Sequence, residues 1–447
     1  MTSSNMFIQE LRDKLSLAEI VGKKVHWDKR KSSQSKGSFW ACCPFHDEKT
    51  ASFKVDDIKG FYYCFGCHEK GDCITFLRKT ENLDFFSAVK ILSLQAGMQI
   101  PNSFGTKQET VDGTTRQTLI DIHELAVKYY INCLNETPST NASDFLSNRV
   151  GSKKIIADFK LGFAPESRKK LFNYLNQQGH DAERIIRSGL CARNEDGDIY
   201  DRFRNRIIFP IINQNNEIVG LGGRALSSNA KAKYLNSPET EIFQKGKLLF
   251  NQNNCFRTIR NPEKVIVVEG YMDVIALSKI GIKNCVAPLG TAITSDQLQK
   301  IWRMSNTPIF AFDGDSSGER ALIRLSYLAL PLLSPEKTIQ ACRLPAEQDP
   351  DDLISKFGKD AIMNLLEKPQ SLLEIIWEYE TKNTTYETPE NRALLDDKLG
   401  NILKNISNTN LRNHFSSAFF ELKKKLFRLG GNSYSDFLPK PLMPRFD

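Results

Sequence analysis

The chain has 447 residues, of which 40% are hydrophobic and 26% are charged, and its formal net charge at pH 7 is +8. One compact core rarely serves a chain of this length, so we expect two to four domains. No apolar run reaches the ~18 residues of a membrane-spanning helix, and the N-terminal segment carries acidic residues rather than a basic and apolar export signal. We therefore expect a cytoplasmic protein with no membrane partner.

A cluster of potential metal ligands lies within the first hundred residues. Two residues separate Cys43 from His46, and two residues separate Cys64 from Cys67. Each spacing lets a tight turn aim two ligands at one tetrahedral ion, and thiolate with imidazole suits zinc. Because four protein ligands leave no open position, the pattern predicts one structural zinc ion.

Two residues beside this cluster are alternative ligands, because a shift of register would bring Cys42 or His68 to the ion. The same segment interleaves aromatic and basic side chains, which could offer stacking surfaces to unpaired bases. In so small a domain, we expect most of the aromatic side chains to belong to the core. The residues concerned are Phe39, Trp40, Phe53, Phe61, Tyr62 and Tyr63, with Lys54 and Lys59.

The middle of the chain begins after a polar segment, residues 101–117, whose Gly and Thr content and lack of periodicity predict a linker. From 118 to about 258, helical patterns give way to the strand-like segments "RIIFPII" and "EIVGLGG", which we expect to form a hairpin. Pro210 has no amide hydrogen, so its strand should lie at an edge or contain a bulge.

From residue 264, apolar strand patterns alternate with helical patterns, which predicts a parallel sheet with helices on its faces. The functional groups of such sheets lie at the carboxyl ends of the strands. After about residue 358 the pattern is helical with short connections, and residues 429–447 have the composition of a loose tail.

Acidic residues follow the predicted strands of this sheet. Glu269 ends one apolar run, and Asp313 and Asp315 follow another. A later segment, "AEQDPDDL", supplies Asp349, Asp351 and Asp352. Like charges this close resist joint ionisation unless a cation lies between them, and carboxylates without His or Cys favour Mg²⁺ or Mn²⁺, which serve phosphoryl chemistry. The ordinary alternative for each residue alone is a helix N-cap.

The segments "VVEGYMDVIAL" and "FAFDGDSSG" resemble the Toprim fold that primases, type IA and type II topoisomerases and some nucleases share. Further segments resemble, in the same order, the motifs of bacterial DnaG-type replicative DNA primases. They are "CPFHDEKTASF", "YYCFGCHEKGD", "DRFRNRIIFPI", "GLGGRAL", "KYLNSPET", "FQKG" and "LPAEQDPDDL". The resemblance covers roughly residues 6–358 and, more faintly, the helices to about residue 428.

The resemblance implies a multidomain fold of the α+β and α/β classes. Its parts are a small zinc-ribbon domain, a mixed α/β basic subdomain, a Toprim-type parallel sheet flanked by helices, and a C-terminal helical subdomain. The expected boundaries are 1–100 for the zinc-binding domain, 101–117 for the linker, 118–258 for the N-terminal basic subdomain of the catalytic core, 259–358 for the Toprim domain, 359–428 for the helical subdomain and 429–447 for the tail.

The resemblance also implies roles for individual residues. The zinc ligands of the family fall on Cys43, His46, Cys64 and Cys67. Its catalytic acidic positions, which hold Mg²⁺ or Mn²⁺, fall on Glu269, Asp313, Asp315, Asp349 and Asp351. Its basic groove for nucleotide and template falls on Arg202, Arg204, Arg206, Arg224, Lys233, Asn236 and Lys245.

The function that the resemblance implies is template-directed synthesis of short RNA primers on single-stranded DNA from ribonucleoside triphosphates during DNA replication. A monomer is expected. Family members normally continue into a further helical domain that docks on the replicative helicase, for which a chain ending at Asp447 has little room. Two rival functions stay open: a non-catalytic zinc protein that binds single-stranded DNA, and another Toprim enzyme, such as a nuclease.

Two positions in the zinc segment depart from the family pattern. Ala51 stands where proline is usual, and His68 stands where glycine is usual. Neither change removes a predicted ligand.

Overall fold

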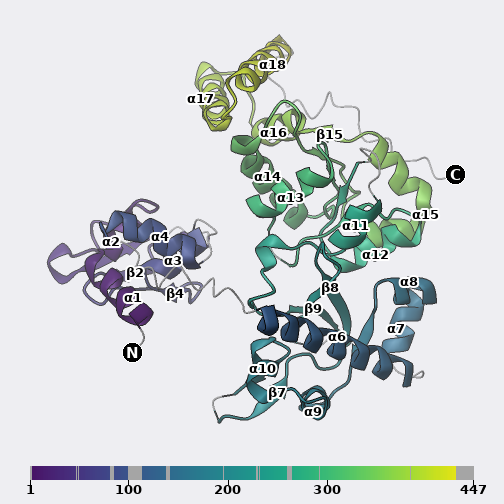
Figure 1. The fold of residues 1–447 in the computed structure, drawn as a ribbon. Coiled ribbons are helices and arrows are strands. Elements are labelled where there is room, and N and C mark those ends of the chain that lie inside the picture. Colours follow the sequence, from purple (N-terminus) through teal and green to yellow (C-terminus); the bar gives the residue numbers. More distant parts are fainter. Residues whose placement is uncertain are drawn as a thin grey trace. The chain divides into compact units, whose positions relative to one another are not determined.

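The computed structural model describes residues 3–46, 48, 50–80, 85–98, 113–136, 141–194, 196–227, 230, 232–258, 264–290, 292–382 and 384–428. The chain divides into two compact units, Met1–Gly113 and Thr114–Asp447 (Figure 1). Of the predicted linker, residues 101–112 lie outside the described residues, and residues 113–117 begin a helix. The predicted tail, residues 429–447, lies entirely outside the described residues. Among the described helices, none combines the length and apolar character that crossing a membrane requires.

The first unit is built on a four-stranded antiparallel sheet in the order β1-β2-β3-β4. Side chains alternate between its faces, and Phe53 and Tyr62 are fully buried on one face against Phe76 of the following helix. Trp40 and Tyr63 lie on the opposite face and are half-buried. The elements are α1 (Ser3–Lys14), α2 (Leu17–Gly22), η1 (Gln34–Lys36), β1 (Ser38–Ala41), β2 (Phe53–Asp56), β3 (Phe61–Cys64), β4 (Lys70–Gly71), α3 (Cys73–Thr80) and α4 (Phe85–Gln95).

A second antiparallel sheet, β10-β9-β8-β5, organises the first part of the second unit, and its pair β8–β9 is the predicted hairpin. Strand β5 pairs with β8 only as far as Ile208, and a register shift against β9 lies between Ile211 and Ile212. Pro210 therefore lies where the strand is incompletely paired, as its missing amide hydrogen requires. The elements are α6 (Gly113–Glu136), α7 (Asn141–Arg149), α8 (Lys153–Asp158), β5 (Gly162–Ala164), α9 (Lys170–Gln177), α10 (Ala182–Arg187), β6 (Cys191–Arg193), β7 (Ile199–Asp201), β8 (Arg206–Ile212), β9 (Ile218–Ala225), β10 (Tyr234–Asn236), η2 (Lys245–Lys247) and α11 (Gln252–Thr258).

The predicted parallel sheet follows, in the order β12-β11-β13-β14-β15. Its first four strands are parallel, and β15 pairs with β14 in the antiparallel sense. Connections between parallel strands pass through helices, which confirms the expected α/β architecture. The elements are β11 (Ile266–Val267), α12 (Tyr271–Lys279), β12 (Cys285–Val286), α13 (Ser295–Met304), β13 (Ile309–Phe310), α14 (Ser316–Ala329), η3 (Leu330–Leu332), β14 (Gln340–Ala341), α15 (Pro350–Glu367) and β15 (Gln370–Ser371).

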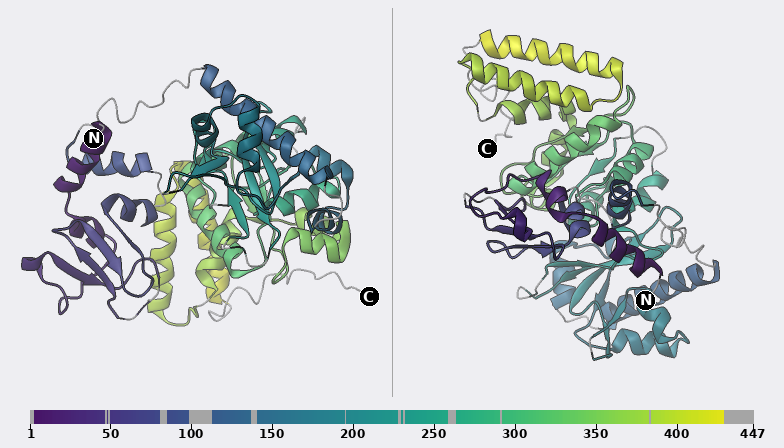
Figure 2. Two further views of the ribbon diagram at one scale, coloured as in Figure 1. Left: turned by 90° about the horizontal axis from the view of Figure 1, so that it is seen from below. Right: turned by 90° about the vertical axis from the view of Figure 1, so that its left-hand side faces the viewer.

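The chain continues into the predicted helical region. Helix α15 bends at Gly358, where a φ of +77° interrupts the helical conformation. Three further helices follow, and Figure 2 shows the last two side by side. They are α16 (Leu372–Thr381), α17 (Pro389–Asn405) and α18 (Thr409–Arg428).

Candidate metal centres and active site

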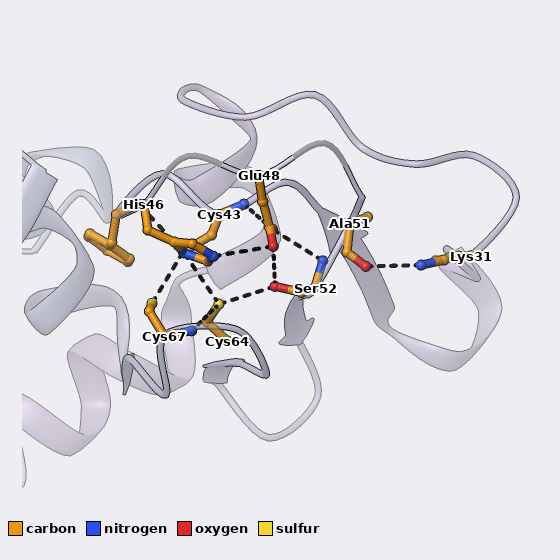
Figure 3. Close-up of polar contacts among 9 residues, drawn as sticks. Lys31, Cys43, His46, Glu48, Ala51, Ser52, Cys64 and Cys67 are labelled. Atoms are coloured by element: carbon orange, nitrogen blue, oxygen red, sulfur yellow. Dashed lines mark hydrogen bonds and ion pairs between the residues drawn. The ribbon is translucent and has the colours of Figure 1, made fainter.

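Two segments of the first unit bring the four predicted zinc ligands together (Figure 3). One segment follows β1 and the other ends β3, and the ligand atoms of the four residues all lie within 4.8 Å of one another. The Sγ atoms of Cys43 and Cys67 are 3.8 Å apart. This separation matches the edge of about 3.8 Å that Zn–S bonds of ~2.3 Å give a tetrahedron. The donor set and its spacing fit a tetrahedral zinc ion.

A carboxylate that the sequence reasoning missed supports this cluster. Glu48 accepts hydrogen bonds from the backbone nitrogen atoms of Cys43 and Ser52, at 2.7 and 3.2 Å, and its Oε2 lies 3.3 Å from Nε2 of His46. Burial acts to raise the pKa of Glu48, but the hydrogen bonds from Ser52 and Cys43 outweigh it and lower the pKa. Glu48 is therefore held as a carboxylate beside the imidazole.

The two alternative ligands lie outside this cluster. Cys42 is exposed, and Nδ1 of His68 lies 2.8 Å from the hydroxyl of Tyr63. His68 has a φ of +61°, in the left-handed region that glycine adopts most readily. His68 thus occupies a backbone conformation that glycine would adopt without strain.

The carboxyl ends of β11 and β13 bring the first two acidic segments into contact. These strands are adjacent and parallel, and the backbone nitrogen of Asp313 donates a hydrogen bond to Oε1 of Glu269 at 2.9 Å. The beginning of α14 is equally close, since a Cβ atom at Gly318 would lie 2.9 Å from the same Oε1. Glu269 and Asp313 therefore share one end of the sheet, as their positions after neighbouring strands predict.

A backbone contact brings the third acidic segment to the same place. The nitrogen of Gly314 donates to the carbonyl of Gln348 at 2.9 Å, and the nitrogen of Glu347 donates to the carbonyl of Gly314 at 3.2 Å. A Cβ atom at position 314 would overlap the carbonyl oxygen of Pro345. Only glycine permits this approach, so Gly314 joins the loop after β13 to the loop before α15.

Asp315 and Asp349 are both helix N-caps. Oδ1 of Asp315 accepts from the nitrogen atoms of Ser317 and Gly318, each at 2.8 Å, and Oδ1 of Asp349 accepts from that of Asp352 at 2.6 Å. Each cap uses one carboxylate oxygen and leaves the other without a hydrogen-bond partner among the described residues. The N-cap alternative and a metal-binding role are thus compatible in the same side chain.

The electrostatics of the site centre on Asp313. Burial, followed by the charges of Glu269 and Asp349, raises the pKa of Asp313 to about 7. Its Oδ1 atom is buried and has no hydrogen-bond partner within the described part of the chain. Burial also raises the pKa of Glu269. A buried oxygen without a donor among like charges fits a divalent cation, although the described carboxylates form no group as tight as the Cys and His cluster.

Asp351 differs from the other predicted acidic residues. Its side chain is buried, and its Oδ2 forms an ion pair of 2.7 Å with Arg149 at the end of α7. Burial raises the pKa of Asp351, while the Arg149 guanidinium acts to lower it. This carboxylate therefore already has a cationic partner.

The sequence patterns did not predict that Asp273 is a further acidic residue near this site. It is buried in the first turn of α12, where its Oδ2 accepts from the nitrogen of Gly270 at 2.9 Å. Burial, followed by the charges of Asp313 and Asp349, raises the pKa of Asp273 well above its ordinary value. Its place in "EGYMD", three residues after the N-cap Gly270, was the available signal.

Three of the seven predicted groove residues donate hydrogen bonds to backbone carbonyls of the second unit. Arg206 donates to backbone carbonyls of β9 and of the segment leading to β10, and Arg202 donates to the carbonyl of Asn236 at 3.3 Å. Burial lowers the pKa of both arginines. The Asn236 side chain donates to the carbonyl of Leu289 at 2.8 Å and accepts from the hydroxyl of Tyr271 at 2.6 Å.

Of the other four predicted groove residues, two are exposed and two are half-buried. Arg204 is exposed, with its guanidinium 5.5 Å from the ring centre of Tyr200, and Lys233 is also exposed. Arg224 lies 4.2 Å from the ring centre of Phe145, and Lys245 is half-buried at the start of η2. Three of the seven predicted residues thus bond to backbone carbonyls, while Arg204 and Lys233 leave their charges exposed.

Family models match most of the chain. The model described as the CHC2 zinc finger matches residues 3–108, the DNA primase catalytic core, N-terminal domain, matches 129–255, and the Toprim domain matches 263–343. The zinc finger and Toprim matches agree with a structural zinc site and a site for divalent metal.

Curated proteins and solved structures extend these matches. A DNA primase of Rickettsia felis is 37% identical over 93% of this chain and 68% of its own length, and one of Escherichia coli K12 is 33% identical over 97% and 73%. A solved DnaG primase catalytic domain bound to single-stranded DNA is 33% identical, with a TM-score of 0.63, over 69% of this chain and 100% of its own.

Proposed function

The chain belongs to the DnaG family of DNA primases, and is thus a DNA-directed RNA polymerase, and we propose that nucleotidyl transfer takes place at the acidic residues around Asp313. The observation that carries this proposal is the buried Oδ1 of Asp313, for which the structure describes no hydrogen-bond partner, in a residue whose backbone nitrogen bonds to Glu269. Divalent cations bound there, Mg²⁺ or Mn²⁺, would offset the charge of the triphosphate and of the attacking and leaving oxygens.

The acidic side chains would divide this work. Asp313 would hold the cations through its buried Oδ1, and Asp315 and Asp349 would do so through the oxygens that their helix caps leave available. Glu269 would orient the Asp313 loop through its hydrogen bond, and act as a further ligand or general base. Asp351 would lie at the edge of the site, with Arg149 as its partner until a cation replaces it.

The basic groove would bind the template and the ribonucleoside triphosphates. Arg204 and Lys233, which are exposed, and Arg224 and Lys245, which are half-buried, would contact phosphates through their positive charges. Arg202, Arg206 and Asn236 would act mainly by fixing the strands that carry them.

The zinc unit would bind unpaired template bases on its sheet. Cross-strand pairing aligns Trp40 with Lys54, Lys54 with Tyr63, and Tyr63 with Lys70, in one row across four strands. The ammonium group of Lys54 lies 5.9 Å from the ring centre of Trp40. Alternating rings and cations suit stacked bases and their phosphates.

The remaining partners follow from the family. We expect a single structural zinc ion in the first unit, a monomeric chain in the cytoplasm, and a replicative helicase as protein partner. Size-exclusion chromatography with light scattering, with and without the helicase, tests whether the chain is a monomer and whether it binds the helicase.

The experiment that tests the function is a primer-synthesis assay with the full chain, single-stranded DNA, labelled ribonucleoside triphosphates and Mg²⁺. Asp313→Ala is the test variant, and Asp396→Ala, an exposed position on α17, is the control. Template-dependent oligoribonucleotides that only Asp313→Ala abolishes support the proposal. Loss of the DNA substrate would indicate a nuclease, and binding without product, with Mn²⁺ as well, would indicate a non-catalytic binding protein.

A further inference from the structure

A charged surface on α14 and α16 lies beside the acidic site and outside the predicted groove. Two hollows, of about 280 and 340 Å³, adjoin there and share Arg320 and Arg324 in their walls. Glu269 lines the first hollow, and Tyr379 and Lys382 line the second. The surface therefore leads from an acidic residue of the active site to an aromatic side chain on α16.

The two arginines give this surface its charge. They are four residues apart on α14, so their side chains lie on the same face of the helix. Both are exposed, and within the described part of the chain neither guanidinium has a hydrogen bond or ion pair. Lys382, in contrast, pairs with Glu319 at 2.7 Å. Two positive charges are thus left uncompensated next to the active site.

Tyr379 adds an aromatic surface at the far end. Its side chain is 47% exposed, a high fraction for so large a ring. The helix that carries it is held in place, because the hydroxyl of Tyr327 on α14 donates to Glu380 and Lys382 pairs with Glu319. The ring therefore lies on a helix that contacts with α14 hold in position.

We propose that Arg320, Arg324, Tyr379 and Lys382 form a binding surface for single-stranded nucleic acid that continues from the acidic site. The arginines would contact consecutive phosphates, and Tyr379 would stack on a base. This combination binds single strands without reading their sequence. The inference rests on the proposed function only in placing the reacting end of the strand at Glu269.

The test measures binding of a fluorescent oligothymidylate to the full chain by anisotropy, at several salt concentrations and without added Mg²⁺. The variants are Arg320→Ala/Arg324→Ala and Tyr379→Ala. The control, Lys425→Ala/Arg428→Ala, removes the same charge from exposed positions on α18. Thermal melting of every variant verifies folding.

We expect the double variant to bind more weakly and its salt slope to fall by about 1.4, because each phosphate contact contributes ~0.7 on a single strand. Tyr379→Ala should weaken binding by about fivefold or more. The control should match the parent chain. Ultraviolet crosslinking of a bromodeoxyuridine-substituted strand should label the peptide that contains Tyr379.

Unchanged affinity and salt slope in the double variant overturn the inference. If the same variant instead raises the KM for ribonucleoside triphosphates, the first hollow is a nucleotide site and the inference is again wrong. Binding is measured without catalysis, so a failure of Asp313→Ala to abolish primer synthesis would count against the proposed function alone.

Discussion

Oε2 of Glu48 lies 3.3 Å from Nε2 of His46, while Nδ1 of the same ring faces Sγ of Cys64 at 3.9 Å. The two nitrogen atoms of the imidazole therefore have different tasks. Nδ1 is turned toward the thiolates, and Nε2 can donate its hydrogen to the carboxylate. Such a carboxylate partner fixes the tautomer and orientation of a zinc-binding histidine.

Glu48→Gln should weaken zinc binding by about 10- to 100-fold, because the amide is a poorer acceptor for the imidazole N–H. Competition with a chromophoric chelator measures this affinity directly. Glu19→Gln, at an exposed position on α2, is the matched control. Equal affinities in the two variants would contradict the role of Glu48.

Cys64→Ser should lower the zinc content from one ion per chain and unfold the first unit alone, since structural zinc contributes directly to folding. Cys42→Ser, at an exposed neighbour of the ligand Cys43, should keep one zinc ion. Metal analysis and proteolysis of the two units distinguish the variants. One zinc ion retained in Cys64→Ser would refute the ligand set.

Substitutions at Asp315 should separate its two roles. Ser can cap α14 as Asp does, whereas Ala loses about 1 kcal/mol of cap stabilisation. We expect both Asp315→Ser and Asp315→Ala to lose primer synthesis. The alanine variant should also melt at a lower temperature than the serine variant, because it loses the helix cap. Full activity in Asp315→Ser would make the residue a cap and nothing more.

Mg²⁺ affinity should depend on pH through Asp313. Burial and the neighbouring acids raise its pKa to about 7, and only the ionised carboxylate binds the cation. Below pH 7 the affinity should therefore fall by about tenfold per pH unit, and above pH 7 it should level off. Calorimetric titration of Mg²⁺ from pH 6 to pH 8.5 tests this, and Asp313→Asn should remove that pH dependence along with most of the affinity.

Trp40→Ala should weaken single-stranded DNA binding by about fivefold or more, through loss of one stacking surface in the row of rings and lysines. Ile58→Ala removes an exposed apolar side chain outside this row and should leave binding unchanged. Zinc content should stay at one ion in both variants. Full affinity in Trp40→Ala would show that single-stranded DNA does not bind on this sheet.

The fold class and the meeting of the acidic segments were predictable because the carboxyl ends of neighbouring parallel strands share one edge of a sheet. That rule alone predicts that Glu269 and Asp313 lie close together. The four Cys and His positions were predictable from their spacing alone, and the structure brings them together as expected.

Other features depend on contacts that local patterns do not encode. Asp273 has the sequence position of an ordinary helix-start residue, and its burial depends on packing by distant segments. The charge of Arg206 is visible in the sequence, but its orientation toward backbone carbonyls is set by strand pairing. Glu48 lies in a loop, where no periodicity indicates which side chain turns inward.

The close approach of Gly314 to the Pro345 carbonyl has a consequence for how the active site can evolve. Any side chain at position 314 would have to displace a backbone carbonyl, so position 314 cannot change while the two acidic loops keep their spacing. A change of this spacing would have to come from other positions in the two loops.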